Sequence, residues 1–433
     1  MPLRLDDRND DFGAQIDALI ATKREETVHV GSEVRTIIEH VVSDGDRALV
    51  ELTERFDRHV LDPARLRLPQ FAIDAAYKDC DPAVVEALER AAQRILAFHE
   101  RQRPDDIAYT DDIGVRLGQR WRPIDAVGLY VPGGKAAYPS SVLMNALPAK
   151  VAGVERLAIV VPAPDGELAP LVLVAAKLAG IDEVYPIGGA QAVAALAYGT
   201  ETIQAVDKIV GPGNAYVAEA KRQVFGRVGI DMIAGPSEVV VVADGDNDPA
   251  WVAADLLSQA EHDEMAQAIL ITDSHTLASA VEQEVQRQLE ELPKRAIAGV
   301  SWESLGAVVV LTSMASAPSL VNRIAPEHLE LMVANPEAMS EEIRHAGSIF
   351  LGPYTPEVIG DYVGGPNHVL PTNRTARFAS GLSVFDFMKR TTLLGCDSNS
   401  FNDLAPAAAM LAHAENLAAH AKAVEIRMTN DGQ

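Results

Sequence analysis

Two adjacent polar residues, Glu327 and His328, follow Pro326 in the segment NRIAPEHLELMV. Their types suit proton transfer, because imidazole titrates near neutrality and a carboxylate can activate water. The segment Ser319–Val333 is predicted to be a helix. The apolar residues after the pair indicate that the pair lies near the start of a helical stretch within this segment. An exposed polar pair in the first turn of a helix is the alternative interpretation.

A second candidate group begins with Gln259 and His262, which are three residues apart in DLLSQAEHDE, a predicted helix that starts after Asp248 and Pro249. Residues at this spacing share one face of a helix, so they could bind one metal ion. Such pairs are also common on solvated helix surfaces. A zinc site needs further nitrogen or oxygen ligands. The candidates are Asp361, His368, His413, Glu415 and His420. The spacing does not choose among them.

Three glycine-containing turns separate strand-like runs from helical stretches. They hold Gly128, Gly133 and Gly134, then Gly188 and Gly189 before Gln191, and Gly211 and Gly213 before Asn214. Each could be a tight turn without a ligand, but together they favour a nucleotide site, because open α/β sheets bind ligands at the carboxyl ends of strands. None is the G-x-G-x-x-G fingerprint or a P-loop. Ser237 precedes another apolar strand, where its hydroxyl could face a cleft or be an ordinary turn serine.

The elements that must position these residues alternate from Leu157 onward between β-branched runs and Ala-rich helical stretches. The runs are LAIVV, VYPIGG, KIVGPG and SEVVVVA, then AILIT, AVVVL and SIFLG. Parallel strands need helical crossovers, so the pattern predicts an α/β fold with two similar doubly wound layers. Residues from about Asp11 to Arg103 read as helices. Strand signals stop at about Phe385, and Ala405–Ala423 reads as a terminal helix that packs away from the body or reaches a second subunit.

Composition narrows the classes of function. The chain has 433 residues, 48% hydrophobic and 23% charged, with a net charge of −25. This charge repels nucleic acid and anionic membranes, so we expect small-molecule partners. Cys80 and Cys396 are far apart and read as inert thiols of a reducing compartment. The acidic start is no signal peptide and no apolar run is long enough to cross a bilayer, so a cytoplasmic location is expected.

Seven long segments strongly resemble the histidinol dehydrogenase family, in family order and from near Met1 to the final helix. They are GLYVPGGKAAYPSSVLMN, GPGNAYVAEAKRQVFG, IDMIAGPSEV, DLLSQAEHD, RIAPEHLEL, GSIFLGPYTPEVIGDYVGGPNHVLPT and SGLSVFDFMKRT. The resemblance implies an α/β fold with two incomplete Rossmann-like domains that lack the glycine fingerprint, and helical extensions at both termini. Residues 1–25 would be the N-terminal helical segment, and residues 26–125 with 237–384 the first Rossmann-like domain, which carries the catalytic and most zinc residues. Residues 126–236 would be the second Rossmann-like domain, with the NAD contacts, and residues 385–433 the C-terminal helical tail.

The resemblance also implies the roles of individual residues. A zinc ion, one per subunit, would be held by Gln259, His262, Asp361 and His420. Glu327 and His328 match the family's acid and base residues. NAD contacts carry over to Tyr130, Gln191 and Asn214. The substrate would meet Ser237, Glu415, His328 and the zinc ligands.

The activity implied by the resemblance is a pair of sequential oxidations, from L-histidinol through L-histidinaldehyde to L-histidine, each with one NAD. Zinc would orient the substrate, His328 would accept protons, and Glu327 would assist the attack of water on the aldehyde. The C-terminal tail would reach the partner in a homodimer, so that each site takes Glu415 and His420 from the neighbouring chain. Alternatives are a sister enzyme that oxidises another polar alcohol such as a sulfonated diol, a zinc hydrolase, and a non-catalytic nucleotide-binding module.

Overall fold

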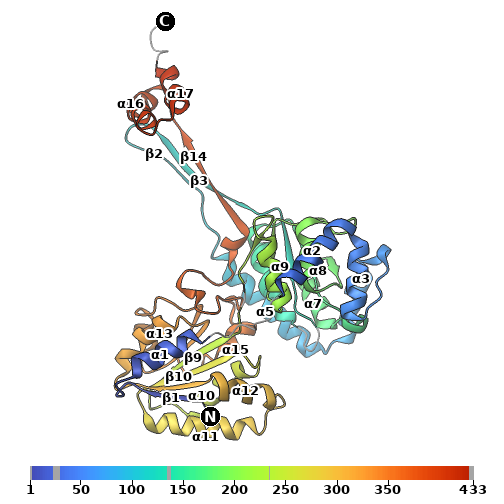
Figure 1. The fold of residues 1–433 in the computed structure, drawn as a ribbon, viewed down its shortest axis with the longest axis vertical. Coiled ribbons are helices and arrows are strands. Elements are labelled where there is room, and N and C mark those ends of the chain that lie inside the picture. Colours follow the sequence, from blue (N-terminus) through green and yellow to red (C-terminus); the bar gives the residue numbers. More distant parts are fainter. Residues whose placement is uncertain (1, 23–29, 134–137, 234, 429–433) are drawn as a thin grey trace. The chain divides into compact units, whose positions relative to one another are not determined.

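The computed structural model describes residues 2–22, 30–133, 138–233 and 235–428. The predicted boundary between residues 25 and 26, and Gly134 of the first glycine turn, lie outside these residues. Two compact units make up the chain (Figure 1): unit 1 is Met1–Gln102 with Asp125–Asp386, and unit 2 is Arg103–Ile124 with Phe387–Gln433. Unit 1 holds two parallel sheets, and unit 2 holds a small antiparallel sheet and two helices.

The larger sheet of unit 1 has six parallel strands in the order β1-β11-β10-β9-β12-β13. They are β1 (Leu3–Asp6), β9 (Glu238–Ala243), β10 (Gln267–Thr272), β11 (Ala307–Val310), β12 (His328–Met332) and β13 (Ser348–Leu351). Every residue of the four central strands is buried. Parallel sheets are covered on both faces, which is why these strands read as nearly continuous apolar runs.

Helices cover both faces of this sheet, as Figure 1 shows. Along β9, Val239 and Val241 pack with one layer of helices, whereas Val240 and Val242 pack with the other, as the two-residue period of a strand requires. The first layer is α10 (Pro249–Ala260), α11 (His275–Leu289) and α12 (Arg295–Leu305). The second includes α1 (Phe12–Ala21), the turn η4 (Met314–Ser316), α13 (Ala317–Ile324) and α14 (Pro336–Ser340).

The second sheet of unit 1 has five parallel strands in the order β6-β5-β4-β7-β8. They are β4 (Ala126–Tyr130), β5 (Arg156–Val160), β6 (Glu183–Tyr185), β7 (Lys208–Val210) and β8 (Gly229–Ile230). Its connecting helices are α6 (Pro139–Ala152), α7 (Pro170–Leu178), α8 (Gly189–Tyr198) and α9 (Ala215–Val224), with the turn η3 (Pro164–Gly166). The α/β class with two parallel layers is thereby confirmed.

The N-terminal part is arranged differently from the expectation. Residues 1–25 were expected to be helical, but Leu3–Asp6 forms an edge strand on β11 before α1 begins. Residues 26–125 were grouped with 237–384, yet the helices from residue 31 onward pack with the five-stranded sheet, because the apolar face of α2 meets α8 and α9. These elements are α2 (Gly31–Asp44), α3 (Asp46–Asp57), η1 (Pro63–Arg65), α4 (Gln70–Ala75), η2 (Ala76–Asp79) and α5 (Pro82–Glu100).

Unit 2 corrects the expectation that strands end at about Phe385. After the turn η7 (Val384–Phe387), β14 (Met388–Gly395) pairs antiparallel with β3 (Arg116–Pro123), which also pairs with β2 (Ile107–Thr110). The single terminal helix is instead α16 (Ser398–Ala414) and α17 (Ala418–Met428), separated where Asn416 takes a positive φ of 58°. Asparagine is a common left-handed helix terminator. No helix of the described ranges is long and apolar enough to cross a membrane.

Candidate active site

Glu327 and His328 lie at the amino end of β12, so the prediction of a helix across Ser319–Val333 is wrong beyond Ile324. The helix α13 ends there and Ala325 takes a left-handed conformation, after which the chain enters the sheet. Pairing with Val239 and Ser348 fixes His328 between two neighbouring strands. Glu327 and His328 expose only 5% and 3% of their surfaces, so the alternative of an exposed polar pair is excluded.

The hydrogen bonds of His328 define which ring nitrogen is free. Its Nδ1 lies 3.1 Å from the carbonyl oxygen of Glu238, and a carbonyl can only accept, so Nδ1 carries the proton. Nε2 is buried and has no hydrogen-bond partner among the described residues. It faces Asp361, whose Oδ1 is 3.6 Å away. Whenever the ring is neutral, Nε2 therefore holds the unshared electron pair that a general base requires.

Two buried carboxyl groups flank the other side of this ring. Oε2 of Glu327 and Oε2 of Glu357, the latter on α15 (Glu357–Ile359), each lie 3.7 Å from Nδ1 of His328. Burial raises the pKa of Glu327 to about 8 and that of Glu357 to about 7, although the His328 charge lowers both. Burial opposes the imidazolium, but the two carboxylates raise the pKa of His328 well above its usual value. The group therefore combines carboxyl groups of raised pKa with a ring that holds its proton more tightly than a free imidazole does.

Gln259 and His262 come together at the end of α10. The Gln259 side-chain amide donates to Nδ1 of His262 across 2.9 Å, with Gln259 fully buried and His262 exposed beyond the last turn. A solvated surface pair is thus excluded for Gln259. Its Oε1 is buried and has no hydrogen-bond partner in the described part of the chain. A buried oxygen without a donor is costly unless a ligand or ion satisfies it.

Asp361 and His368 lie in and after the π-helical turn η5 (Gly360–Gly364), which follows α15. The His368 Nδ1–H donates to the backbone oxygen of Asp361 across 2.9 Å. Burial opposes the Asp361 carboxylate, but the nearby His328 ring keeps the pKa of Asp361 lowered. Asp361 also interacts electrostatically with His262, so this turn links the Gln259 and His328 parts of the site.

The donors present fit a zinc ion in kind, because zinc takes imidazole nitrogens and oxygen ligands. Gln259 offers an unpartnered oxygen, Asp361 a carboxylate and His262 an imidazole. However, the described ranges contain no group of three or more His, Cys, Asp or Glu side chains close enough to hold a metal by themselves. A complete site needs the glutamine oxygen and a further ligand.

The predicted NAD residues lie at the carboxyl side of the five-stranded sheet. Tyr130 ends β4, and its hydroxyl accepts the Gly189 N–H across 3.0 Å. Burial raises the pKa of Tyr130 to about 12, so the hydroxyl stays neutral. Gln191 is buried in α8, and the Asn214 side chain caps α9 by accepting two backbone N–H groups. The strand order reverses between β4 and β7, which is where such sheets bind ligands.

Ser237, Glu415 and His420, the three other predicted site residues, make no hydrogen bond or ion pair with the His328 group among the described residues. Ser237 is half-buried and directly precedes Glu238, whose backbone N–H donates to Oε2 of Glu327 across 3.0 Å, so it lies at the edge of the sheet that carries Glu327 and His328. Glu415 and His420 are exposed residues of unit 2. His413, the remaining candidate, pairs with Glu425 across 2.8 Å within unit 2.

Sequence reasoning missed a set of buried carboxyl groups behind His328. Glu330 lies two residues along β12 and accepts the backbone N–H of Glu357 across 2.6 Å, while Ser258 donates to Oε1 of Glu357 across 3.0 Å. Asp255 of α10 interacts with Glu330, and each carboxyl group affects the pKa of the other. The available signal in the sequence was Glu330, a charged residue inside the otherwise apolar run of β12. Glutamate is rarely buried without a partner or a function.

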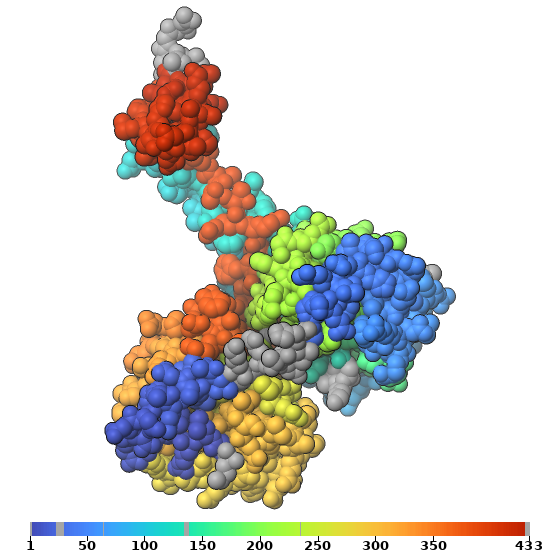
Figure 2. Space-filling model, in the orientation of Figure 1, coloured from blue at the N-terminus to red at the C-terminus, as the bar shows by residue number. Residues whose placement is uncertain are grey.

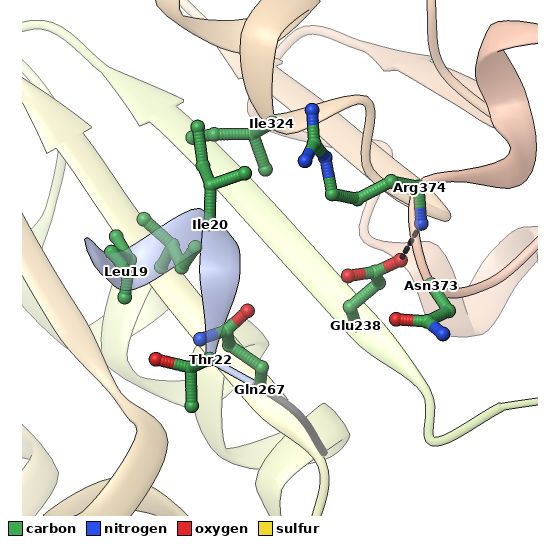
Figure 3. A pocket seen from close by; sticks show the side chains of 9 residues that line it. Leu19, Ile20, Thr22, Glu238, Gln267, Ile324, Asn373 and Arg374 are labelled. Carbon is green, nitrogen blue, oxygen red and sulfur yellow. Dashed lines mark hydrogen bonds between the residues drawn. The ribbon is translucent and has the colours of Figure 1, made fainter. Parts of the chain in front are cut away.

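Glu238, whose backbone carbonyl binds His328, also lines a small cavity (Figure 3). Its lining includes Leu19, Ile324, Gln267, Asn373 and Arg374, and the Arg374 backbone N–H donates to Oε1 of Glu238 across 3.4 Å. The accessible volume of about 20 Å³ has room for one water molecule, not for a coenzyme or an amino alcohol.

Comparison with known proteins identifies the family. The sequence model described as histidinol dehydrogenase matches residues 20–428. The chain belongs to the histidinol dehydrogenase family. It is 60% identical to the histidinol dehydrogenases of Rhodospirillum rubrum and Ruegeria pomeroyi, over 99% of this chain and 99% of each relative. The crystal structure of histidinol dehydrogenase from Elizabethkingia anophelis is 36% identical and superimposes with a TM-score of 0.95, covering 100% of this chain and 99% of that one. The protein is therefore an oxidoreductase of histidine biosynthesis.

Replacing Glu330 by glutamine is expected to raise the thermal stability at alkaline pH. Burial and the Asp255 charge raise the pKa of Glu330 well above its usual value, so the folded chain binds this proton more tightly than the unfolded chain. The stabilisation from that proton is present at low pH and is lost as pH rises towards the folded-state pKa. Glutamine stays neutral and keeps an acceptor for the Glu357 N–H.

Melting curves at about pH 5 and about pH 8 test this linkage. The wild-type and Glu330→Gln chains should have similar Tm values at the lower pH, and the variant should have the higher Tm at the upper pH. The exposed Glu264, replaced in the same way, is a control that should not change either curve. A variant that is less stable by the same amount at both pH values contradicts the argument.

Proposed function

We propose that this chain oxidises L-histidinol through L-histidinaldehyde to L-histidine, in two NAD-dependent steps at one site. The observation that carries the proposal is the buried His328, whose Nε2 is unpartnered beside Asp361 while Nδ1 is fixed by the Glu238 carbonyl. A base held this way suits removal of a proton from an alcohol.

Each residue has a distinct part in the two steps. NAD, when bound, supplies the hydride acceptor for both oxidations. In the first step the substrate hydroxyl gives its proton to Nε2 of His328 as the carbon loses hydride, which leaves the aldehyde. In the second step Glu327 takes a proton from the water that attacks the aldehyde carbon, while His328 returns its proton to the carbonyl oxygen, which gives the hydrate. His328 then accepts a hydroxyl proton of the hydrate as the carbon loses its second hydride, which leaves the carboxylic acid. The raised pKa of Glu327, about 8, places its titration near working pH.

The NAD part of the proposal rests on the five-stranded sheet. We assign the contacts to Tyr130, Gln191 and Asn214, which follow or cap elements at the carboxyl side of β4, β6 and β7. The backbone N–H groups at the start of α9 and the close approach of glycine loops suit a phosphate group. The coenzyme would then lie at the reversal of strand order between β4 and β7.

The metal part of the proposal assigns one zinc ion per subunit. Its ligands would be Gln259, His262, Asp361 and His420 of the partner subunit, and the zinc would fix the amino and imidazole nitrogens of the substrate. Ser237 and Glu415 would complete the substrate contacts. Elemental analysis of the purified protein should find zinc near one ion per chain, and Asp361→Asn should lower that content. Equal zinc in both proteins contradicts the assignment.

The homodimer part of the proposal is supported by the surface of unit 2. A three-stranded sheet needs a covered apolar face for stability, yet most residues of β2 and β14 are exposed. The helices α16 and α17 also present apolar side chains to solvent, and Figure 2 shows their open surface in red. The large exposed apolar residues of unit 2 include Leu394, Met410, Leu411 and Ile426. Such surface commonly marks a protein interface.

The deciding experiment is the reduction of NAD, followed by absorbance, when the zinc-loaded protein receives L-histidinol. We expect L-histidine as the product and two NADH per molecule oxidised. A sister enzyme would reduce NAD with a sulfonated diol instead, and a hydrolase or nucleotide-binding module would reduce none. NAD reduction without histidine formation would also overturn the proposal.

A further inference from the structure

A buried ion pair joins α9 to the residue after β8 in the five-stranded sheet. The side chains of Lys221 and Asp231 contact each other and expose only 3% and 1% of their surfaces. Each side chain also binds the same residue: Lys221 Nζ donates to the Gly211 carbonyl across 2.9 Å, and the Gly211 N–H donates to Oδ2 of Asp231 across 2.7 Å. Oδ1 of Asp231 accepts the Met232 N–H across 2.7 Å as well. Both backbone polar groups of Gly211 are therefore held by one ion pair.

Gly211 is placed where a side chain would not fit. It directly follows β7 with a φ of +113°, and a Cβ atom built on it would lie 2.1 Å from the backbone oxygen of Tyr130. Tyr130 in turn binds the Gly189 N–H through its hydroxyl. The loops that follow β4, β6 and β7 are thus connected through Gly211 and Tyr130.

Stability alone is a poor explanation for this ion pair. Removing two charges from water costs about as much as their attraction returns, and apolar residues of similar volume often serve as well. The pair is instead suited to fixing backbone direction, because each partner also binds a defined backbone atom of Gly211. Gly211 is the first residue of the segment Gly211–Asn214, which leads into the start of α9 (Figure 1).

We propose that Lys221 and Asp231 are positioning residues for coenzyme binding. They hold the β7–α9 loop in the conformation that NAD meets at the reversal of strand order, without themselves contacting the coenzyme. This inference rests on the proposed NAD function. It predicts a selective loss of NAD affinity when the pair is removed, because the His328 group belongs to the other sheet and, among the described residues, is not hydrogen-bonded to the pair.

Three variants test the pair: Lys221→Met, Asp231→Asn and the double variant. Each single variant leaves one buried group unpaired and should lower Tm, whereas the double variant removes both charges and should regain part of that loss. The KM for NAD should rise about tenfold in Lys221→Met and in the double variant, the factor that corresponds to one lost charge-assisted hydrogen bond. The KM for L-histidinol and the rate at saturating NAD should stay within about twofold of wild type. Calorimetry with NAD alone should show the same loss of affinity.

The matched control is Arg156→Met in the same sheet. Arg156 and Glu183 form a less buried ion pair, 2.9 Å apart, at the amino ends of β5 and β6, away from the glycine loops. This variant should lower Tm without changing the KM for NAD. If Lys221→Met does not fold, the double variant carries the comparison.

The outcomes separate two kinds of failure. Unchanged NAD affinity, parallel changes in both KM values, or return of NAD affinity together with Tm in the double variant would each overturn the positioning role. A wild-type protein that neither binds nor reduces NAD would overturn the proposed function on which the inference rests.

Discussion

Asparagine in place of His328 should slow both oxidations by roughly 10²- to 10⁴-fold, the usual loss for a general base. The side-chain amide of asparagine can still donate towards the Glu238 carbonyl, which His328 binds at 3.1 Å. What it cannot supply is an unprotonated nitrogen at the position of Nε2. In the proposed mechanism both steps lose a hydroxyl proton to that nitrogen, so both rates should fall.

Glutamine in place of Glu327 is expected to act on one step. In the proposed mechanism Glu327 acts on the water that enters after the aldehyde has formed, so this variant should mainly slow the conversion of aldehyde to acid. The Glu238 N–H, which donates to Oε2 of Glu327 across 3.0 Å, keeps an acceptor in the glutamine oxygen, so the local structure should persist. The rate of alcohol oxidation should stay within about tenfold of the wild-type rate in this variant.

Stopped-flow measurements with L-histidinol and L-histidinaldehyde as separate substrates compare the two variants. Metal content and melting temperature, measured in parallel, show whether either substitution disturbs more than the chemistry. Equal losses for both variants on both substrates would contradict the division of labour between Glu327 and His328.

The fold could be predicted where sequence periodicity had one physical cause. Apolar β-branched runs such as EVVVVA and QAILIT are buried on both faces, and this produces the uninterrupted pattern that marks a parallel strand. The segment HLELM is equally buried, but its glutamate breaks the run. A helix was therefore expected, because a buried charged residue is exceptional and its partners lie far away in sequence.

The strand β14 could not be predicted for the opposite reason. Its residues are mostly exposed on both faces, so MKRTTLLG shows neither alternation nor a continuous apolar run. Only pairing with β3, more than 200 residues earlier in the chain, defines it as a strand. Long-range pairing of this kind leaves no local signal.

Several residues of the candidate site could be predicted from the sequence, but the buried groups around them could not. Glu327, His328 and Asp361 are brought together, with His328 between the other two. Glu357 and Glu330 were missed, because the first lies in a loop-rich segment and the second in an apparent helix. Their effect on His328 depends on burial and on distances that no sequence spacing encodes.

Mixing two inactive chains should restore activity if each site is shared between subunits. We expect a His328→Asn chain and a His420→Asn chain to be almost inactive alone, since the first lacks the base and the second lacks a proposed zinc ligand. In a heterodimer with shared sites, one site carries both lesions and the other carries none. Random association makes about half of the dimers heterodimers, so the mixture should recover about a quarter of wild-type activity.

The location of the residues makes this result informative. His328 is buried in the larger sheet of unit 1, whereas His420 is exposed on α17 of unit 2. If each chain completed its own site, every site in a heterodimer would carry one lesion, and co-expressed chains would stay as inactive as the parents. Two chains that both carry His328→Asn are the control for mixing itself. Two-fold symmetry makes both composite sites of the wild-type dimer identical. Recovery of activity in the mixture would therefore show that one chain supplies His420 to the site that holds the His328 of the other chain.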